Sequence, residues 1–209
     1  MLKPAKPSAK REAILDAAQR AFLEEGYTAT SMDGVATGAS VSKATIYAHF
    51  ESKEQLFAAV MHRRCDSSFV LVPPDESADA RTALTVIAQR LMALLMAPET
   101  LALYRVVVAE ASRSPDLART FYDNGPVRSK AAITAVIALL QRRGELSPAA
   151  DAETITDQLI GMLRAETFHR ALLGLPDGRS LDDTIAATVE TLVRSFGGAA
   201  PGKAVRPTP

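Results

Sequence analysis

The sequence has little that would place the protein outside a reducing compartment. It contains a single cysteine, Cys65, which excludes an intramolecular disulfide framework and fits a cytoplasmic location. Lys10, Arg11 and Glu12 stand where the apolar stretch of a signal peptide would lie, so no secretion signal is expected. No run of residues approaches the roughly 18 apolar residues that a membrane-spanning helix needs, and we expect no membrane partner.

An excess of charge of one sign is also missing. The 24 lysines and arginines balance the 24 aspartates and glutamates, so the formal net charge is zero. This balance argues against nonspecific coating of nucleic acid, but it does not exclude a locally basic face. Hydrophobic residues make up 47% of the chain, which is enough to bury a sizeable core in one or two domains.

Strand-like alternation of polar and apolar residues is lacking over any useful length, whereas helical spacing is present throughout. Gly26 is a candidate helix stop, because glycine tolerates the left-handed cap conformation. Candidate N-caps are Thr30 or Ser31 for the second helix, Ser42 for the third and Ser52 for the fourth. The N-terminal helices are expected at about 8–25, 31–38, 42–48 and from 52 to before the Pro73-Pro74 pair.

Six further helices are expected after that proline pair. The helix at 98–113 is apolar nearly all round, so it should be central and buried. We expect a short helix from Pro115 to end at Asn124-Gly125-Pro126. The others are expected at about 77–97, 126–143, 151–173 and 180–196.

The predicted fold is therefore all-α. It consists of an N-terminal three-helix helix-turn-helix domain, closed by the fourth helix, and a larger C-terminal helical bundle for ligand binding and dimerisation. We place the domains at 8–68 and 69–196, followed by a disordered tail at 197–209.

The segment from Thr30 to Phe50, TSMDGVATGASVSKATIYAHF, carries the functional signal. Its two short helices are separated by only about three residues, Ala39 to Val41. Such a short connection makes the helices cross steeply, and the second helix is left exposed along its outer edge. This is the geometry of a helix-turn-helix, whose second helix enters the major groove of DNA by its N-terminal end.

The residues at that end suit contact with DNA. Ala44 is small enough for close approach and for contact with a thymine methyl, and the hydroxyls and ammonium from Ser42 to Thr45 can read base edges. Tyr47, His49 and Lys53 are placed for phosphates, which position the protein without specifying sequence. The alternative stays open at this point, because any small polar helix has Ser, Lys and Thr, and an isolated tyrosine is more often an amphipathic core residue.

Residues 10–61 resemble the DNA-binding domain of the tetracycline-repressor (TetR) family. The matching features are REAILDAAQRAFLEEGYTATSMD (11–33) and VSKATIYAHFESKEQLFAAV (41–60). The resemblance implies that the second short helix is the recognition helix and that Ser31 contacts the DNA backbone. It assigns DNA-facing roles to Ser42, Lys43, Ala44, Thr45, Tyr47, His49 and Lys53.

One position departs from the family pattern. The family usually has glycine at the turn position that Ser40 occupies here, and a left-handed backbone at a non-glycine residue costs roughly 1–2 kcal/mol. Gly38, two residues earlier, offers another place for the turn. We expect the turn itself to survive.

The stretch LYRVVVAEASRSPDLARTFYDNGPVRSKAAI (103–133) resembles the regulatory domain of AefR-like members of the same family. This resemblance implies a helical sensor domain for an unknown small-molecule effector and a homodimer through the last two long helices, 151–173 and 180–196. Two copies about one DNA turn apart, ~34–36 Å, would fit a palindromic operator in double-stranded DNA. The alternative is that these helices only close the core of one chain.

The sensor part offers several candidate effector-binding residues. Charges inside an otherwise apolar helix need partners or a polar ligand, which singles out Arg105 and Glu110. A structural ion pair and core aromatics are the alternative. The candidates are Met92, Tyr104, Arg105, Glu110, Phe121, Tyr122, Phe168 and His169.

Other chemistry has weaker support. Glu166 and His169 have the spacing of an iron-binding pair, but a second such pair is missing, so no metal or other cofactor is expected. No catalytic residues are expected, although an all-α enzyme or ligand-binding protein with a pocket in 75–175 is the alternative function. Cys65 is either inert packing or a thiol switch. A basic arm (Lys3, Lys6, Lys10 and Arg11) either touches DNA or is solvated.

Overall fold

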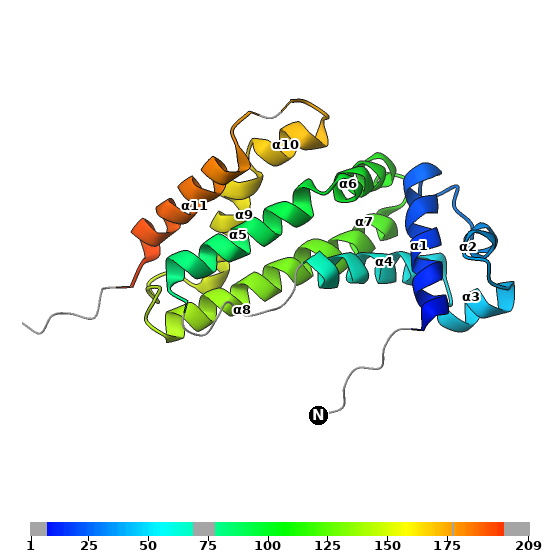
Figure 1. Ribbon diagram of the computed structural model, residues 1–209, viewed down its shortest axis with the longest axis horizontal. Helices are drawn as coiled ribbons and strands as arrows, with labels where there is room; N and C mark the ends of the chain where they lie inside the picture. Colours follow the sequence, from blue (N-terminus) through cyan, green and yellow to red (C-terminus); the bar gives the residue numbers. More distant parts are fainter. Residues whose placement is uncertain (1–7, 69–77, 177, 199–209) are drawn as a thin grey trace, which may run out of the picture. The chain divides into compact units, whose positions relative to one another are not determined.

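The structure is a computed structural model that describes residues 8–68, 78–176 and 178–198 (Figure 1). Within these ranges the elements of regular secondary structure are all helices, one isolated bridge joins Leu146 and Gly197, and the predicted all-α class is confirmed. The chain divides into two compact units.

The first unit combines the N-terminal residues up to 69 with 97–128. Its helices are α1 (Ala9–Glu24), α2 (Met32–Gly38), α3 (Lys43–His49), α4 (Lys53–Ser68), α6 (Pro98–Glu110), α7 (Pro115–Tyr122) and the π-helix η1 (Asp123–Val127). The second unit contains α5 (Ala80–Met96), α8 (Arg128–Arg142, with Arg128 itself grouped in the first unit), α9 (Ala152–Arg164), α10 (Thr167–Leu172) and α11 (Leu181–Phe196).

The core of the first unit is continuous from α1 to α7. Ile46 of α3 is fully buried in it, together with the apolar faces of α1 and α4. Phe22, Tyr27 and Phe57 form an aromatic cluster with ring centroids 5.3–5.6 Å apart. Four residues of α6 and α7 belong to the same core: Leu103, Val107, Leu117 and Phe121. The predicted N-terminal domain thus shares its core with helices that begin 30 or more residues after its end.

An arginine of α4 fastens α4 to α1. The Arg63 guanidinium lies 2.7 Å from the Asp16 carboxylate and 3.2 Å from that of Glu12, and it donates to the Gln19 amide oxygen at 3.3 Å. These contacts hold the first and last helices of the predicted DNA-binding segment together.

In the second unit, α11 lies along α5 and α9 (Figure 1). The buried face of α11 includes Ile185, Val189 and Leu192, which recur at the spacing of a helical stripe. Lys130 of α8 bonds the carboxylates of Asp157 and Glu153 on α9, each at 2.8 Å, and these bonds raise the pKa of Lys130 above its usual range.

The structure differs from three of the predicted helices, namely those at 98–113 and 151–173 and the short one from Pro115. The helix expected at 151–173 is broken, because α9 ends at Arg164 and α10 begins at Thr167. The helix expected at 98–113 ends at Glu110 and is not buried all round, since Val108 is 65% exposed. Its apolar residues outnumber the core positions that one side of a helix can supply.

The Asn124-Gly125-Pro126 sequence does not end a helix. Proline lacks an N–H group and clashes with the preceding turn of an α-helix, and the wider π-helical turn η1 accommodates it and continues directly into α8. The Asn124 side chain donates to the Thr120 carbonyl at 2.8 Å and satisfies an acceptor in this irregular segment.

Among the described residues, no single helix is long and apolar enough to cross a membrane. The consecutive helices α5 and α6 reach the required length and composition only as a bent pair, and most of the apolar residues of α5 are buried within its own unit.

Candidate nucleic-acid interface

The turn between α2 and α3 is a tight, hydrogen-bonded motif centred on Ser40. The Ser40 N–H donates to the Thr37 carbonyl and the Val41 N–H to the Ala36 carbonyl, both at 3.0 Å. These are the two bonds of a Schellman cap, in which one residue is left-handed. That residue is Ser40, with φ 54°, and it is the one non-glycine residue with positive φ in the described ranges. The turn therefore stays in place without a shift to Gly38.

The N-terminal end of α3 presents a polar tip. Ser42 caps the helix, because its Oγ accepts the Thr45 N–H at 3.1 Å and lies 2.8 Å from the Thr45 hydroxyl. Ile46 anchors the opposite side in the core. Ser42, Lys43, Ala44 and His49 are exposed, and Tyr47 is 44% exposed. Thr45 is half-buried, and the other residues predicted to read base edges are accessible.

Lys43 is paired in the absence of DNA. Its ammonium lies 2.9 Å from the Asp33 carboxylate in the first turn of α2, and this hydrogen bond raises the pKa of Lys43. Both side chains are at least 60% exposed, so the pair is screened by water and is worth little. Lys43 can therefore exchange Asp33 for a DNA acceptor at small cost.

The α1–α2 turn, residues 26–30, leads into α2 and is held by its own bonds. Gly26 is left-handed, with φ 83°, as its predicted role as a helix stop requires. Thr30 donates its hydroxyl to the Gly26 carbonyl at 2.8 Å. Ser31 follows as the exposed N-cap of α2 and accepts the Gly34 N–H at 3.0 Å. The turn thus fixes where Ser31 and α2 begin.

Lys53, at the start of α4, binds this turn. Its ammonium donates to the carbonyls of Tyr27 at 2.8 Å, Thr30 at 3.0 Å and Thr28 at 3.3 Å, and it lies 4.5 Å from the centre of the Tyr27 ring. Three carbonyls match the three hydrogens of an ammonium group. A contact between Lys53 and phosphate stays a prediction, and it would require one of these bonds to be given up.

Two carboxylates hold the turn from other sides. Glu54 accepts the Tyr27 hydroxyl at 3.1 Å, and hydrogen bonds from its own backbone and from Ser52 lower the pKa of Glu54. The pKa of Tyr27 is raised mainly by burial, and the nearby negative charge of Glu54 is the second cause. Glu110, the last residue of α6, accepts the Thr28 N–H at 3.0 Å and the Thr28 hydroxyl. Sequence reasoning missed the contact with Glu110, since 82 residues separate it from Thr28.

The predicted effector-binding residues are divided between the two units. In the first unit, Tyr104 and Phe121 stack edge to face at 4.7 Å, whereas Arg105 and Tyr122 are exposed and Glu110 faces the turn. In the second unit, Met92 is buried, and the buried Phe168 ring lies beside the exposed His169 and under the Arg164 guanidinium.

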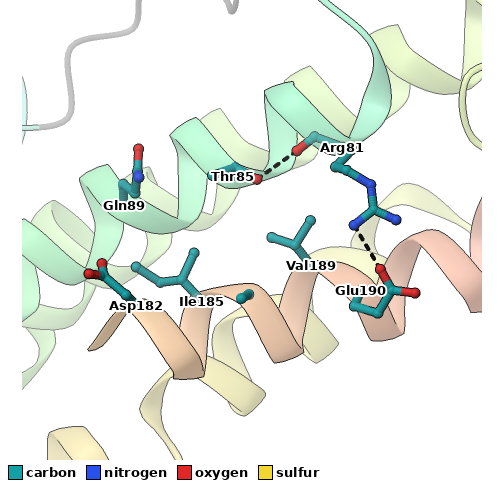
Figure 2. Close-up of a pocket in the computed structure, with 8 residues that line it drawn as sticks. Arg81, Thr85, Gln89, Asp182, Ile185, Val189 and Glu190 are labelled. Atoms are coloured by element: carbon teal, nitrogen blue, oxygen red, sulfur yellow. Dashed lines mark hydrogen bonds and ion pairs between the residues drawn. The ribbon is translucent and has the colours of Figure 1, made fainter. Parts of the chain in front are cut away.

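A groove of about 580 Å³ lies between α5 and α11 in the second unit (Figure 2). Arg81 and Glu190 form an ion pair of 2.7 Å at one end, and Gln89 and Asp182 lie at the other. Hydrogen bonds from Arg81 and, to a smaller extent, Arg194 lower the pKa of Glu190. Ile185 and Val189 are apolar groups on the wall that α11 contributes. None of the residues lining this groove was predicted as a ligand-binding residue, because no local pattern marks two helices that meet across more than 90 residues of sequence.

The remaining candidates are placed as follows. Lys10 is exposed, and the Arg11 guanidinium lies 5.4 Å from the centre of the Phe50 ring, whereas Lys3, Lys6 and the side chain of Cys65 lie outside the described residues. The described part of the chain contains no cluster of three His, Cys, Asp or Glu side chains able to hold a metal ion.

Two short helices joined by a tight turn, with an anchored second helix and an exposed polar tip, define a helix-turn-helix DNA-binding protein. Residues 14–60 match the model of the bacterial regulatory proteins of the tetR family. Residues 82–199, more than half of the chain, match the C-terminal domain of AefR-like transcriptional repressors. The chain belongs to the TetR family of bacterial transcriptional regulators.

Individual relatives agree with this assignment. A TetR-family regulator from Mesorhizobium loti is 32% identical, covers 90% of this chain and 96% of its own, and superposes with a TM-score of 0.73. The flavonoid-responsive regulator FrrA is 31% identical over 91% of this chain and 98% of its own, with a TM-score of 0.76. The transcriptional activator FasR of Mycolicibacterium smegmatis is 43% identical over 58 residues, which are 28% of this chain and 26% of that protein.

Proposed function

We propose that the protein is a ligand-responsive repressor that binds a palindromic operator as a homodimer and releases it when a small-molecule effector binds. The observation that carries this proposal is the polar tip of α3, which is exposed while Ile46 anchors the helix. Family membership supports the same function, since the matched C-terminal domain is that of AefR-like transcriptional repressors. The relatives are named as regulators rather than enzymes, which supports the expectation of no catalytic activity.

The contacts divide into two kinds. Ser42, Lys43, Ala44 and Thr45 are proposed to read bases in the major groove, because they form the N-terminal tip of α3, where the first three are exposed and Thr45 is half-buried. Ser31, Tyr47 and His49 are proposed to bind phosphates on either side and to fix the register. Lys53 supports the interface through the α1–α2 turn.

The dimer is proposed to form through α9–α10 and α11, the segments expected at 151–173 and 180–196. Each of these helices exposes a small residue, Gly161 on α9 and Ala187 on α11, and a Cβ atom at Gly161 would have nothing within 4 Å. Small residues allow helices of two copies to approach closely. Gly161→Arg should therefore give a monomer in light scattering and weaken operator binding.

Effector control requires two states with different affinities for the two ligands. An effector that binds more tightly to the dimer conformation with the wrong spacing of recognition helices lowers the affinity of the dimer for DNA. By linkage, bound DNA must lower the affinity for the effector by the same factor. The C-terminal part, predicted as 69–196, is proposed to hold the effector. The groove between α5 and α11 offers an apolar wall with charged ends, which suits a small amphipathic molecule in a cytoplasmic regulator.

A mobility-shift titration against the promoter region that flanks the protein's own gene tests the function. We expect sequence-preferring binding that weakens steeply with salt, because phosphate contacts release counterions. Lys43→Ala and Tyr47→Ala should reduce binding while circular dichroism and dimer mass stay unchanged. Wild-type protein that binds operator and unrelated DNA equally at moderate salt would rule out the proposal.

A further inference from the structure

The position of Glu110 is unfavourable for the helix that carries it. Glu110 is the last residue of α6, where the helix dipole disfavours negative charge. Its half-buried carboxylate accepts hydrogen bonds from the Thr28 N–H and hydroxyl in the α1–α2 turn. The interactions that offset the unfavourable position therefore come from the turn and not from α6.

The turn is shaped to receive this carboxylate. A Cβ atom at Gly26 would lie 2.9 Å from Glu110 Oε1, so the missing side chain leaves room for Glu110. On another side, the Lys53 ammonium occupies the carbonyls of the same turn. Within the five residues that precede Ser31, Glu110 thus accepts hydrogen bonds from N–H and O–H groups, and Lys53 donates hydrogen bonds to carbonyl groups.

We propose that Glu110 is a positioning residue for operator binding, because its carboxylate fixes the α1–α2 turn and so sets where α2 and the recognition helix α3 are presented to DNA. The proposal rests on the DNA-binding function proposed above. Glu110 itself need not touch DNA. The connection runs from Glu110 to Thr28, along the backbone to the Ser31 cap, and through the Ser40 turn to Ser42.

The experiment measures the affinity of the full-length dimer for operator and for unrelated DNA. Glu110→Gln keeps the shape but removes the charge and one acceptor, and Thr28→Val removes the hydroxyl with little change of shape. Glu99→Gln is the matched control, because it removes the same charge from the other end of α6. Loss of a charge-assisted bond should weaken operator binding about tenfold in Glu110→Gln and leave binding to unrelated DNA unchanged.

A double-mutant cycle identifies the pair. The double variant should lose no more operator affinity than the weaker-binding of the two single variants, since both remove one interaction. Operator affinity of Glu110→Gln equal to that of Glu99→Gln would overturn the proposal. Equal losses on operator and unrelated DNA would also overturn it, because they indicate general destabilisation rather than positioning.

Amide hydrogen exchange tests, without DNA, whether Glu110 holds the α1–α2 turn in place. In Glu110→Gln, the amide of Thr28 and those of residues 31–38 should exchange about tenfold faster, while the amides of α11 stay unchanged. Unchanged exchange in residues 26–38 would refute the role of Glu110 even if the wild type binds its operator. Failure of the wild type to bind any operator would count against the proposed function, while faster exchange would still support the link from Glu110 to the turn.

Discussion

Replacement of Lys53 by methionine tests whether Lys53 acts by holding the α1–α2 turn or by contacting a DNA phosphate. The sequence alone could not distinguish these two roles. Methionine keeps most of the apolar stem and removes the ammonium, which donates to three carbonyls at 2.8–3.3 Å. A hydrogen bond to a charged group contributes about 1.5–3 kcal/mol net, and bonds that share one donor group are not additive. We therefore expect the first unit to lose about 2–3 kcal/mol of stability.

The chain offers a selective probe for this measurement. All four tyrosines (Tyr27, Tyr47, Tyr104 and Tyr122) lie in the first unit, and the sequence has no tryptophan. Intrinsic fluorescence during urea unfolding therefore reports on the first unit alone. With a slope of about 1–3 kcal/mol per molar urea, the midpoint should fall by about 0.7–3 M. Lys43→Met, which removes an exposed ammonium, should leave the urea midpoint close to that of the wild type.

The salt dependence of operator binding tests the other role. Removal of a lysine that contacts phosphate reduces the slope of log affinity against log salt by about 1. If Lys53 acts through the turn, Lys53→Met should weaken binding with the slope unchanged. A midpoint equal to that of the wild type, together with a reduced slope, would refute our reasoning and show direct phosphate contact.

Three further perturbations have defined outcomes. Ser40→Gly should stabilise the first unit by about 0.5–1 kcal/mol in the same fluorescence assay, because glycine adopts the φ of 54° without strain but loses more chain entropy on folding; a lower midpoint would contradict this account of the turn. Asp33→Asn should tighten operator binding about twofold to threefold at low salt in a mobility-shift titration, because Lys43 is released and a negative charge is removed; weaker binding would mean that Asp33 orients Lys43 for DNA. The pKa of Glu54 is lowered on folding, so its contribution is present above the ordinary value of 4.5 and is lost as the pH falls through the lowered pKa. The urea midpoint should therefore decrease when the pH is lowered below about 4.5. This decrease should be less steep in Glu54→Gln than in the wild type.

Local signals predicted the elements that make up the interface. The expected caps were Thr30 or Ser31 for α2 and Ser42 for α3. Ser31 and Ser42 each accept the N–H of the residue three positions later. The turn that was expected to survive is also present, and Ser40 is its left-handed residue. These features depend on interactions within a few residues, and so the sequence pattern carries them directly.

Features that depend on distant contacts could not be predicted in the same way. The apolar run of α6 indicated burial, yet Val108 is exposed because burial depends on which helices pack around α6. Glu110 was interpreted as a residue of an effector pocket, whereas its carboxylate meets Thr28, 82 residues away. Lys53 was placed near phosphates on its position alone, and its three carbonyl partners come from a turn that precedes it by 23 to 26 residues.

The shared core of the first unit has a consequence for domain exchange between regulators. A hybrid joined at residue 68 would take Leu103, Val107, Leu117 and Phe121 from the foreign parent, so the apolar faces of α1 and α4 would meet side chains that did not evolve with them. A transplant that carries residues 97–128 along with 8–68 keeps these partners together. The modular unit of this protein is therefore discontinuous in sequence, and recombination at a single crossover cannot move it intact.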